Sequence, residues 1–107
     1  MSTEQPSLDY IKELSGEDIA FQQKFLRIIK EEFPVEKQTY VDFLVQKDFN
    51  ATAEMVHKLK HKFNILGLQN GYRLAVTYEE ELRNGNTNLK HDFNNVLKVI
   101  ENYITTI

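Results

Sequence analysis

Apolar residues recur every three or four positions near the C-terminus, and this spacing constrains the fold more than any other feature of the chain. The stripe between residues 89 and 107 consists of Leu89, Phe93, Val96, Ile100, Tyr103 and Ile107. An α-helix places residues with this spacing on one face, whereas a half-buried β-strand needs alternation at every second residue. Strict alternation never lasts for more than a few residues here, so the sequence predicts helices and no strand.

Similar stripes divide the rest of the chain into helices joined by short links. The stripe before the last link consists of Leu68, Tyr72, Ala75, Tyr78 and Leu82, and an earlier one consists of Tyr40, Val41, Phe43, Leu44 and Val45. Short links favour antiparallel neighbours. We therefore expect an all-α protein, an antiparallel four-helix bundle with a short additional N-terminal helix, "LDYIKEL", at one end.

Helix boundaries follow from the prolines, glycines and capping residues. Pro34 predicts that the helix "RIIKEEF" ends and that a second helix, "PVEKQTYVDFLVQ", begins with proline in its first turn. Asn50 or Thr52 is expected to cap the next helix. Gly67 and Gly71 should bracket a turn, and "NGN" at 84–86 should separate the last two helices.

Length and composition limit the class of protein. The chain has 107 residues, which suit one domain, 1–107, and we expect residues 1–7 to be a flexible segment. A net charge of −3 disfavours a nucleic-acid binder, and the absence of cysteine excludes disulfides, thiolate catalysis and Cys-rich zinc sites. "MSTEQPS" lacks the pattern of a signal peptide, and no apolar run approaches the roughly 20 residues that cross a bilayer. We expect a cytoplasmic monomer without membrane insertion.

His57 stands out within "AEMVHKLKHKFNILGL" because of the direction in which it points. At about 100° per residue, Met55, Leu59, Phe63 and Leu66 fall between about 160° and 240° from His57, with Val56 at the edge of this arc. Lys60, His61 and Asn64 fall within about 60° of His57. The wheel therefore predicts that His57 is exposed at mid-helix, opposite the core.

An exposed histidine in this setting has three interpretations. It can be an ordinary solvated side chain. It can share a metal ion with His61, although two ligands do not complete a tetrahedral site and the nearby lysines oppose a cation. It can also act as a nucleophile, because a neutral imidazole is competent near pH 7. Lys60 lies one turn away, and Lys58 and Lys62 are expected to form a positive patch that attracts phosphate-bearing or acidic partners.

The segment "VHKLKHKFNILGL" resembles the signature of histidine-containing phosphotransfer domains, the relay modules of multistep two-component signalling. That signature combines histidine, leucine two residues later, lysine, then small residues and a glycine ten positions after the histidine. His57, Leu59, Lys60 and Gly67 fit these places. His61 departs from it, since the family usually has glycine there. A histidine at this place would crowd a partner, donate a hydrogen bond or act as a minor acceptor.

The resemblance implies a four-helix bundle that accepts a phosphoryl group from an aspartyl phosphate on one receiver domain and passes it to another. It assigns the phosphoacceptor role to His57 and phosphate stabilisation to Lys60. His61, Asn64, Glu79 and Arg83 are possible phosphate-proximal residues, although Glu79 and Arg83 alternatively form a simple surface ion pair. The implied partners are response-regulator receiver domains and a hybrid sensor kinase. The chain needs no cofactor, because Mg2+ would be held by the receiver.

The helix "GEDIAFQQKFLRIIKEEF" has an unusually wide apolar arc. Either neighbouring helices and the N-terminal segment cover it, or part of it is a docking surface for a receiver domain, with Phe21, Gln22, Phe25 and Lys58 as possible contacts. Two other functions stay open: a non-catalytic helical adaptor that binds receiver domains, and a small metal-binding helical protein. A kinase is not expected, because the chain has no GxxxxGK[ST] loop.

Overall fold

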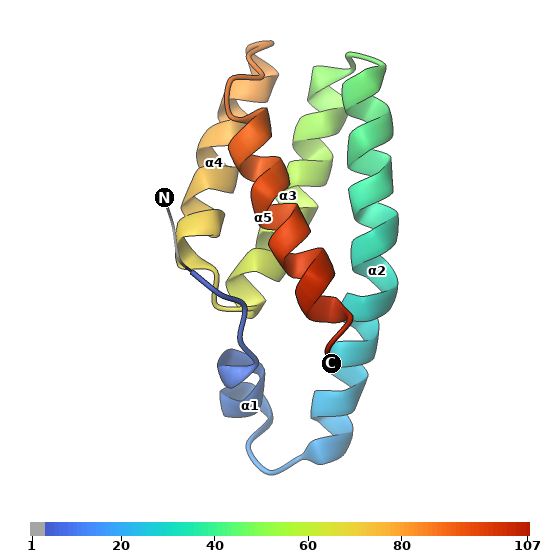
Figure 1. Cartoon of the computed structure of the whole chain (residues 1–107), viewed down its shortest axis with the longest axis vertical. Coiled ribbons are helices and arrows are strands. Elements are labelled where there is room, and N and C mark those ends of the chain that lie inside the picture. The colour runs from blue at the N-terminus through green and yellow to red at the C-terminus, as the bar shows by residue number, and fades with distance from the viewer. Residues whose placement is uncertain (1–3) are drawn as a thin grey trace.

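The computed structural model describes residues 4–107, and this part of the chain is built from α-helices without a β-strand (Figure 1). The elements are α1 (Asp9–Ser15), α2 (Ile19–Val45), α3 (Phe49–Ile65), α4 (Gln69–Arg83) and α5 (Lys90–Ile104). The prediction of an all-α fold is confirmed. In Figure 1, α3 runs between α2 and α4, α5 lies across α3, and α1 sits beside the first turns of α2, beyond the end of α3.

The core is formed by the predicted apolar faces. The stripe of α4 is confirmed, since Leu68, Ala75, Tyr78 and Leu82 are buried and Tyr72 is half-buried. The face of α3 opposite His57 is also confirmed: Met55, Val56, Leu59, Phe63 and Leu66 are all buried. On α5, Phe93 and Ile100 are buried as expected, and Leu97 joins them. The buried face of α5 therefore consists of Phe93, Leu97 and Ile100, and it is rotated toward Leu97 relative to the predicted stripe.

The prediction that a helix ends at Pro34 is wrong, because α2 continues through it. A proline inside a helix removes one backbone hydrogen bond and costs about 3 kcal/mol. Here Ile29, Phe33 and Tyr40 are buried on both sides of the proline, and their helical positions lie within about 40° of one another. Burial of this single face against the core favours one continuous helix and offsets the local cost.

The predicted cap of α3 is also wrong. The helix begins at Phe49, and the side chain of Asp48 caps it by accepting a hydrogen bond from the backbone N–H of Ala51 at 3.2 Å. Thr52 instead donates its hydroxyl to the backbone oxygen of Asp48 at 2.7 Å. Neither Asn50 nor Thr52 precedes the helix, so neither is placed to cap it.

Two of the predicted turn glycines end helices. Gly67 and Gly85 have φ angles of 77° and 78°, the left-handed conformation that glycine adopts without a steric penalty. Gly71 differs from the prediction, because it lies inside α4. A Cβ atom at Gly71 would approach Val96 Cγ1 to 3.2 Å, so this glycine allows α5 to pack closely against α4.

The segment 4–7, part of the N-terminal segment that the sequence predicts to be flexible, forms hydrogen bonds with the turn before α4 and with the first residues of α4. Glu4 accepts hydrogen bonds from the backbone N–H groups of Asn70 at 2.9 Å and Gly71 at 3.1 Å, at the start of α4. The N–H of Ser7 donates to the backbone oxygen of Leu66 at 2.8 Å. Residues 1–3, which belong to the same prediction, lie outside the described residues.

Candidate functional site

His57 lies at the middle of α3 with 48% of its side chain exposed, so the predicted outward orientation is confirmed. The helix positions it there because its buried face is fixed on the opposite side, by Leu59 and Phe63 among others. His57 thus stands in solvent on a rigid element, which suits a residue that must meet a partner molecule.

Glu79 on α4 contacts His57 directly. Its carboxylate oxygens lie 3.2 and 3.3 Å from His57 Nδ1, and the ammonium group of Lys60 lies 3.0 Å from the same carboxylate. The guanidinium group of Arg83, one turn further along α4, is 3.6 Å away. The structure therefore brings together four residues that the sequence had singled out, and we call His57, Lys60, Glu79 and Arg83 the His57 cluster.

Charge within the cluster keeps Glu79 ionised. Burial of the carboxyl group alone would raise the pKa of Glu79, but the hydrogen bond and charge of Lys60, followed by those of His57, hold this pKa below its ordinary value. An ionised carboxylate can only accept hydrogen bonds. The proton of a neutral His57 therefore belongs on Nδ1, and the lone pair is left on Nε2.

Lys60 is enclosed between α3 and α4. Its side chain is 12% exposed, and its ammonium group lies 5.9 Å from the centre of the Tyr72 ring. Arg83 is more exposed, and it also donates to Glu54 on α3 at 3.0 Å. The hydrogen bond to Glu54 raises the pKa of Arg83 above its ordinary value. Both cations of the cluster are thus paired with carboxylates.

His61 and Asn64 share the exposed side of α3 with His57. The ring centres of His57 and His61 are 5.0 Å apart, and the ring planes meet at 86°, so one imidazole presents its edge to the other. Asn64 is exposed one turn beyond. These two predicted site residues therefore border His57 on the side of α3 that faces solvent.

The predicted positive patch of Lys58 and Lys62 is wrong for Lys62. The Lys62 side chain is buried, and its ammonium group pairs with Glu32 at 3.0 Å and Glu36 at 2.9 Å on α2. Lys62 lies about 140° from His57 around α3, which directs it toward α2. Lys58 is exposed and forms no ion pair within residues 4–107.

The proposed docking residues on α2 lie apart from the His57 cluster. Phe21 and Phe25 form a ring pair with centres 5.7 Å apart in the first turns of α2, and Gln22 donates to the backbone oxygen of Gly16 at 3.4 Å. Phe21 is 40% exposed, whereas Phe25 is half-buried against the core. At 1.5 Å of rise per residue, this end of α2 lies on the order of 20 Å from His57 along the helices (Figure 1).

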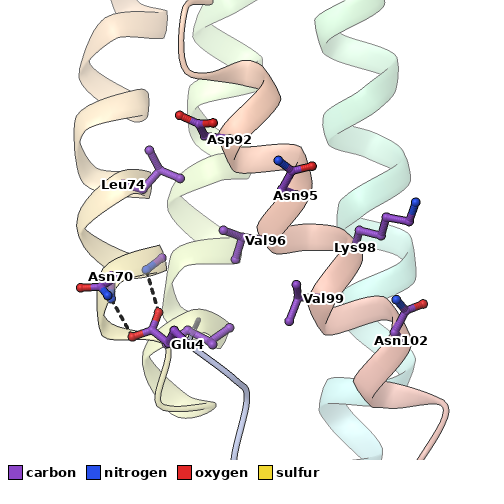
Figure 2. A pocket seen from close by; sticks show the side chains of 11 residues that line it. Glu4, Asn70, Leu74, Asp92, Asn95, Val96, Lys98, Val99 and Asn102 are labelled. Atoms are coloured by element: carbon purple, nitrogen blue, oxygen red, sulfur yellow. Dashed lines mark hydrogen bonds between the residues drawn. The ribbon is translucent and has the colours of Figure 1, made fainter. Parts of the chain in front are cut away.

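A groove that the sequence reasoning missed runs between α4 and α5, with a volume of about 560 Å3. Figure 2 shows Leu74, Val96 and Val99 between the two helices, with polar side chains of α5 along the rim. Leu74 lies about 140° from Glu79 around α4, so the groove opens away from His57. Its only sequence signal is that Val99 lies beside the main apolar stripe of α5.

Within residues 4–107, no three histidine, cysteine, aspartate or glutamate side chains are grouped to hold a metal ion. No helix in that range combines the length and apolar character that crossing a membrane requires. In comparisons with protein-family models, curated proteins and solved structures, nothing matches the chain. The geometry of the His57 cluster therefore carries the functional argument.

Proposed function

We propose that this chain is a histidine phosphotransfer protein of a multistep phosphorelay. In this proposal His57 accepts a phosphoryl group from an aspartyl phosphate of one receiver domain and passes it to an aspartate of another. The supporting observation is the contact of the Glu79 carboxylate with Nδ1 of an exposed histidine. This contact leaves Nε2 as the nucleophile and fixes the ring that carries it.

The chemistry needs little from this chain beyond position and charge. The Nε2 lone pair attacks phosphorus in line, the phosphorus–oxygen bond to the aspartate breaks, and the donor carboxylate leaves. The imidazole keeps its Nδ1 proton and gains positive charge, which the Glu79 carboxylate at 3.2 Å stabilises. The reverse sequence returns the phosphoryl group to a receiver. Any Mg2+ would be held by the receiver, in keeping with the resemblance in "VHKLKHKFNILGL".

Lys60 has two roles in this proposal. Its ammonium group balances the charge of Glu79, to which it donates at 3.0 Å. It also lies one helical turn from His57, where a change of side-chain rotamer brings it toward a phosphoryl oxygen. A phosphoryl group adds between −1.5 and −2 units of charge, so a nearby cation is needed for a long-lived phosphohistidine.

The proposal also concerns the fold and the partners. The helices α2 to α5 would form the antiparallel four-helix bundle of the phosphotransfer family, acting as a cytoplasmic monomer. Lys58 beside His57 would contact the receiver, and Phe21, Gln22 and Phe25 would extend the docking surface. A domain of about 100 residues has a radius of gyration near 13 Å, so one receiver can span the distance between the two regions. A hybrid sensor kinase would supply the phosphoryl group through its receiver.

A non-catalytic adaptor is the second candidate, and one observation favours it. Lys60 and Arg83 are both paired with carboxylates, which reduces the positive charge offered to a phosphoryl group. An adaptor would bind a receiver domain through the same surface without forming phosphohistidine.

The deciding experiment is incubation with a phosphorylated receiver domain, followed by peptide mass mapping under alkaline conditions that preserve phosphohistidine. A phosphoryl group on His57 is expected in the wild type and should be absent from His57→Gln. Receiver binding without any phosphohistidine would replace the carrier by the adaptor. Labelling that persists in His57→Gln would place the acceptor at another residue.

A further inference from the structure

The position of Glu79 determines where a phosphoryl group on His57 would point. Nδ1 faces Glu79 on α4, and Nε2 lies across the imidazole ring from Nδ1. A group attached to Nε2 therefore points away from α4, toward the solvent side of α3. His61 borders that side, with its ring centre 5.0 Å from that of His57.

The permanent cations near His57 are mostly engaged elsewhere. Lys60 is paired with Glu79 on the α4 side of the ring. Arg83 is paired with Glu54 and also faces Glu79.

On the opposite side of α3, Lys62 is held by Glu32 and Glu36 of α2. Apart from Lys60, which reaches a phosphoryl oxygen only by changing its rotamer, what remains beside a phosphoryl group on Nε2 is the exposed ammonium of Lys58 and the imidazole of His61. Of these two side chains, only a histidine changes its charge between pH 6 and 8.

We propose that His61 is the pH-dependent charge partner of the phosphoryl group on His57, and that it makes phosphoryl transfer through this chain sensitive to pH. The inference rests on the proposed function. A protonated imidazole places a positive charge beside the phosphoryl oxygens and can donate a hydrogen bond to one of them. A neutral imidazole offers no such charge, so phosphohistidine is then less favoured.

The sign of the effect follows from this linkage. A phosphoryl group carries between −1.5 and −2 charges, and it would lie on the order of 6 Å from His61 at a solvent-exposed position. Coulomb interaction at that distance in a largely aqueous environment raises the midpoint of His61 titration by roughly one pH unit. Stabilisation of phosphohistidine is then fully present below the unshifted midpoint and is lost as pH rises through the shifted one. Phosphoryl transfer to a receiver is correspondingly favoured at the higher pH.

The carboxylate, ammonium and guanidinium groups around His57 and His61 do not produce this dependence. These groups are the ammonium of Lys58 on α3, the carboxylate of Glu79 and the guanidinium of Arg83 on α4, and the ion pairs of Lys62 with α2. Groups of these types keep their charge between pH 6 and 8 in the absence of unusual burial. The imidazole of His57, with its ring centre 5.0 Å from that of His61, and the phosphoryl group itself also change charge in this range, and both are present in the wild type and in a His61 variant alike. The difference between these two proteins therefore reports on His61.

The experiment treats the full chain with phosphoramidate, which phosphorylates histidine without a receiver, and follows the three histidine ring signals by NMR as a function of pH. The titration midpoint of His61 should rise by roughly one pH unit on phosphorylation of His57. His91, exposed on α5, is the internal control and should not move. In His57→Gln given the same treatment, the His61 midpoint should also stay fixed.

Two failures are distinguishable. If phosphohistidine forms at His57 and the His61 midpoint moves no more than that of His91, the inference is overturned and the carrier function stands. If His57 takes no phosphoryl group from phosphoramidate or from a phosphorylated receiver, the proposed function fails and the inference fails with it. As a second readout, the equilibrium of phosphoryl transfer between the chain and a receiver should depend less steeply on pH between 6 and 8 in His61→Gln than in the wild type, because titration of His57 and of the phosphoryl group is common to both proteins. Retention of the wild-type dependence in that variant overturns the role of His61.

Discussion

Replacing Glu79 by glutamine tests the central feature of the site. The Glu79→Gln variant keeps an oxygen that accepts the Nδ1 proton of His57, so the same ring nitrogen is left to react. It removes only the negative charge 3.2 Å from that nitrogen. The substitution therefore separates the electrostatic role of Glu79 from its role in orienting the imidazole.

The expected magnitude follows from burial. A hydrogen bond to a charged group contributes about 1.5–3 kcal/mol, and the Glu79 side chain is only 14% exposed. His57 is half exposed, so solvent screens part of this energy and about 1–2 kcal/mol is left. At 1.4 kcal/mol per tenfold change, phosphoryl transfer to Glu79→Gln should be roughly 5- to 30-fold slower.

The assay is single-turnover transfer from a phosphorylated receiver, with this chain in excess over the receiver and loss of aspartyl phosphate followed over time. Glu80→Gln is the matched control, because Glu80 is the exposed next residue on α4 and its side chain forms no ion pair with the cluster within residues 4–107. Glu80→Gln should transfer at the wild-type rate. An unchanged or faster rate in a folded Glu79→Gln protein would refute the reasoning, since Glu79 would then act mainly by occupying Lys60.

The other predictions concern the nucleophile, its cation, acid stability and one strained turn. His57→Gln should abolish labelling and change the free energy of unfolding by less than about 0.5 kcal/mol, as measured by urea denaturation, because the site is exposed. Lys60→Ala should shorten the phosphohistidine lifetime in 31P NMR; an unchanged lifetime and unchanged transfer would remove Lys60 from the site. The pKa of Glu79 is lower in the folded state than the ordinary value of 4.5. Its contribution to stability is therefore present above pH 4.5 and is lost as pH falls through the lowered pKa. The acid denaturation curves of wild type and Glu79→Gln should accordingly converge at low pH. Lys47 has a φ angle of 60°, so Lys47→Gly should stabilise the protein by about 1 kcal/mol and raise its melting temperature, whereas Gln46→Gly, at a φ angle of −73°, should lower it.

Helical periodicity predicted those features that depend on one helix alone. The buried residues of α3 and α4 and the exposure of His57 follow from the angle between positions, which tertiary packing does not alter. Pro34 shows where such local reasoning stops. Proline favours the start of a helix because of its own backbone geometry. The free energy gained by burying Ile29, Phe33 and Tyr40 on one face is larger than this local preference, so the helix continues.

The contacts of the site depend on how two helices face each other, and the sequence fixes this only in part. The direction of Lys62 could be predicted from the sequence, because its angle of about 140° from His57 directs it away from the proposed phosphoryl site. Glu79 illustrates the other part. The resemblance put Glu79 near the phosphoryl group, but its contact with Nδ1 depends on the register of α4 against α3. That register is set where the chain turns at Gly67 and where Phe63 and Ala75 are buried in the core. In the proposed function, core packing would therefore determine which ring nitrogen of His57 reacts. A substitution that shifts α4 by one turn should then disable transfer while every residue of the cluster is still present.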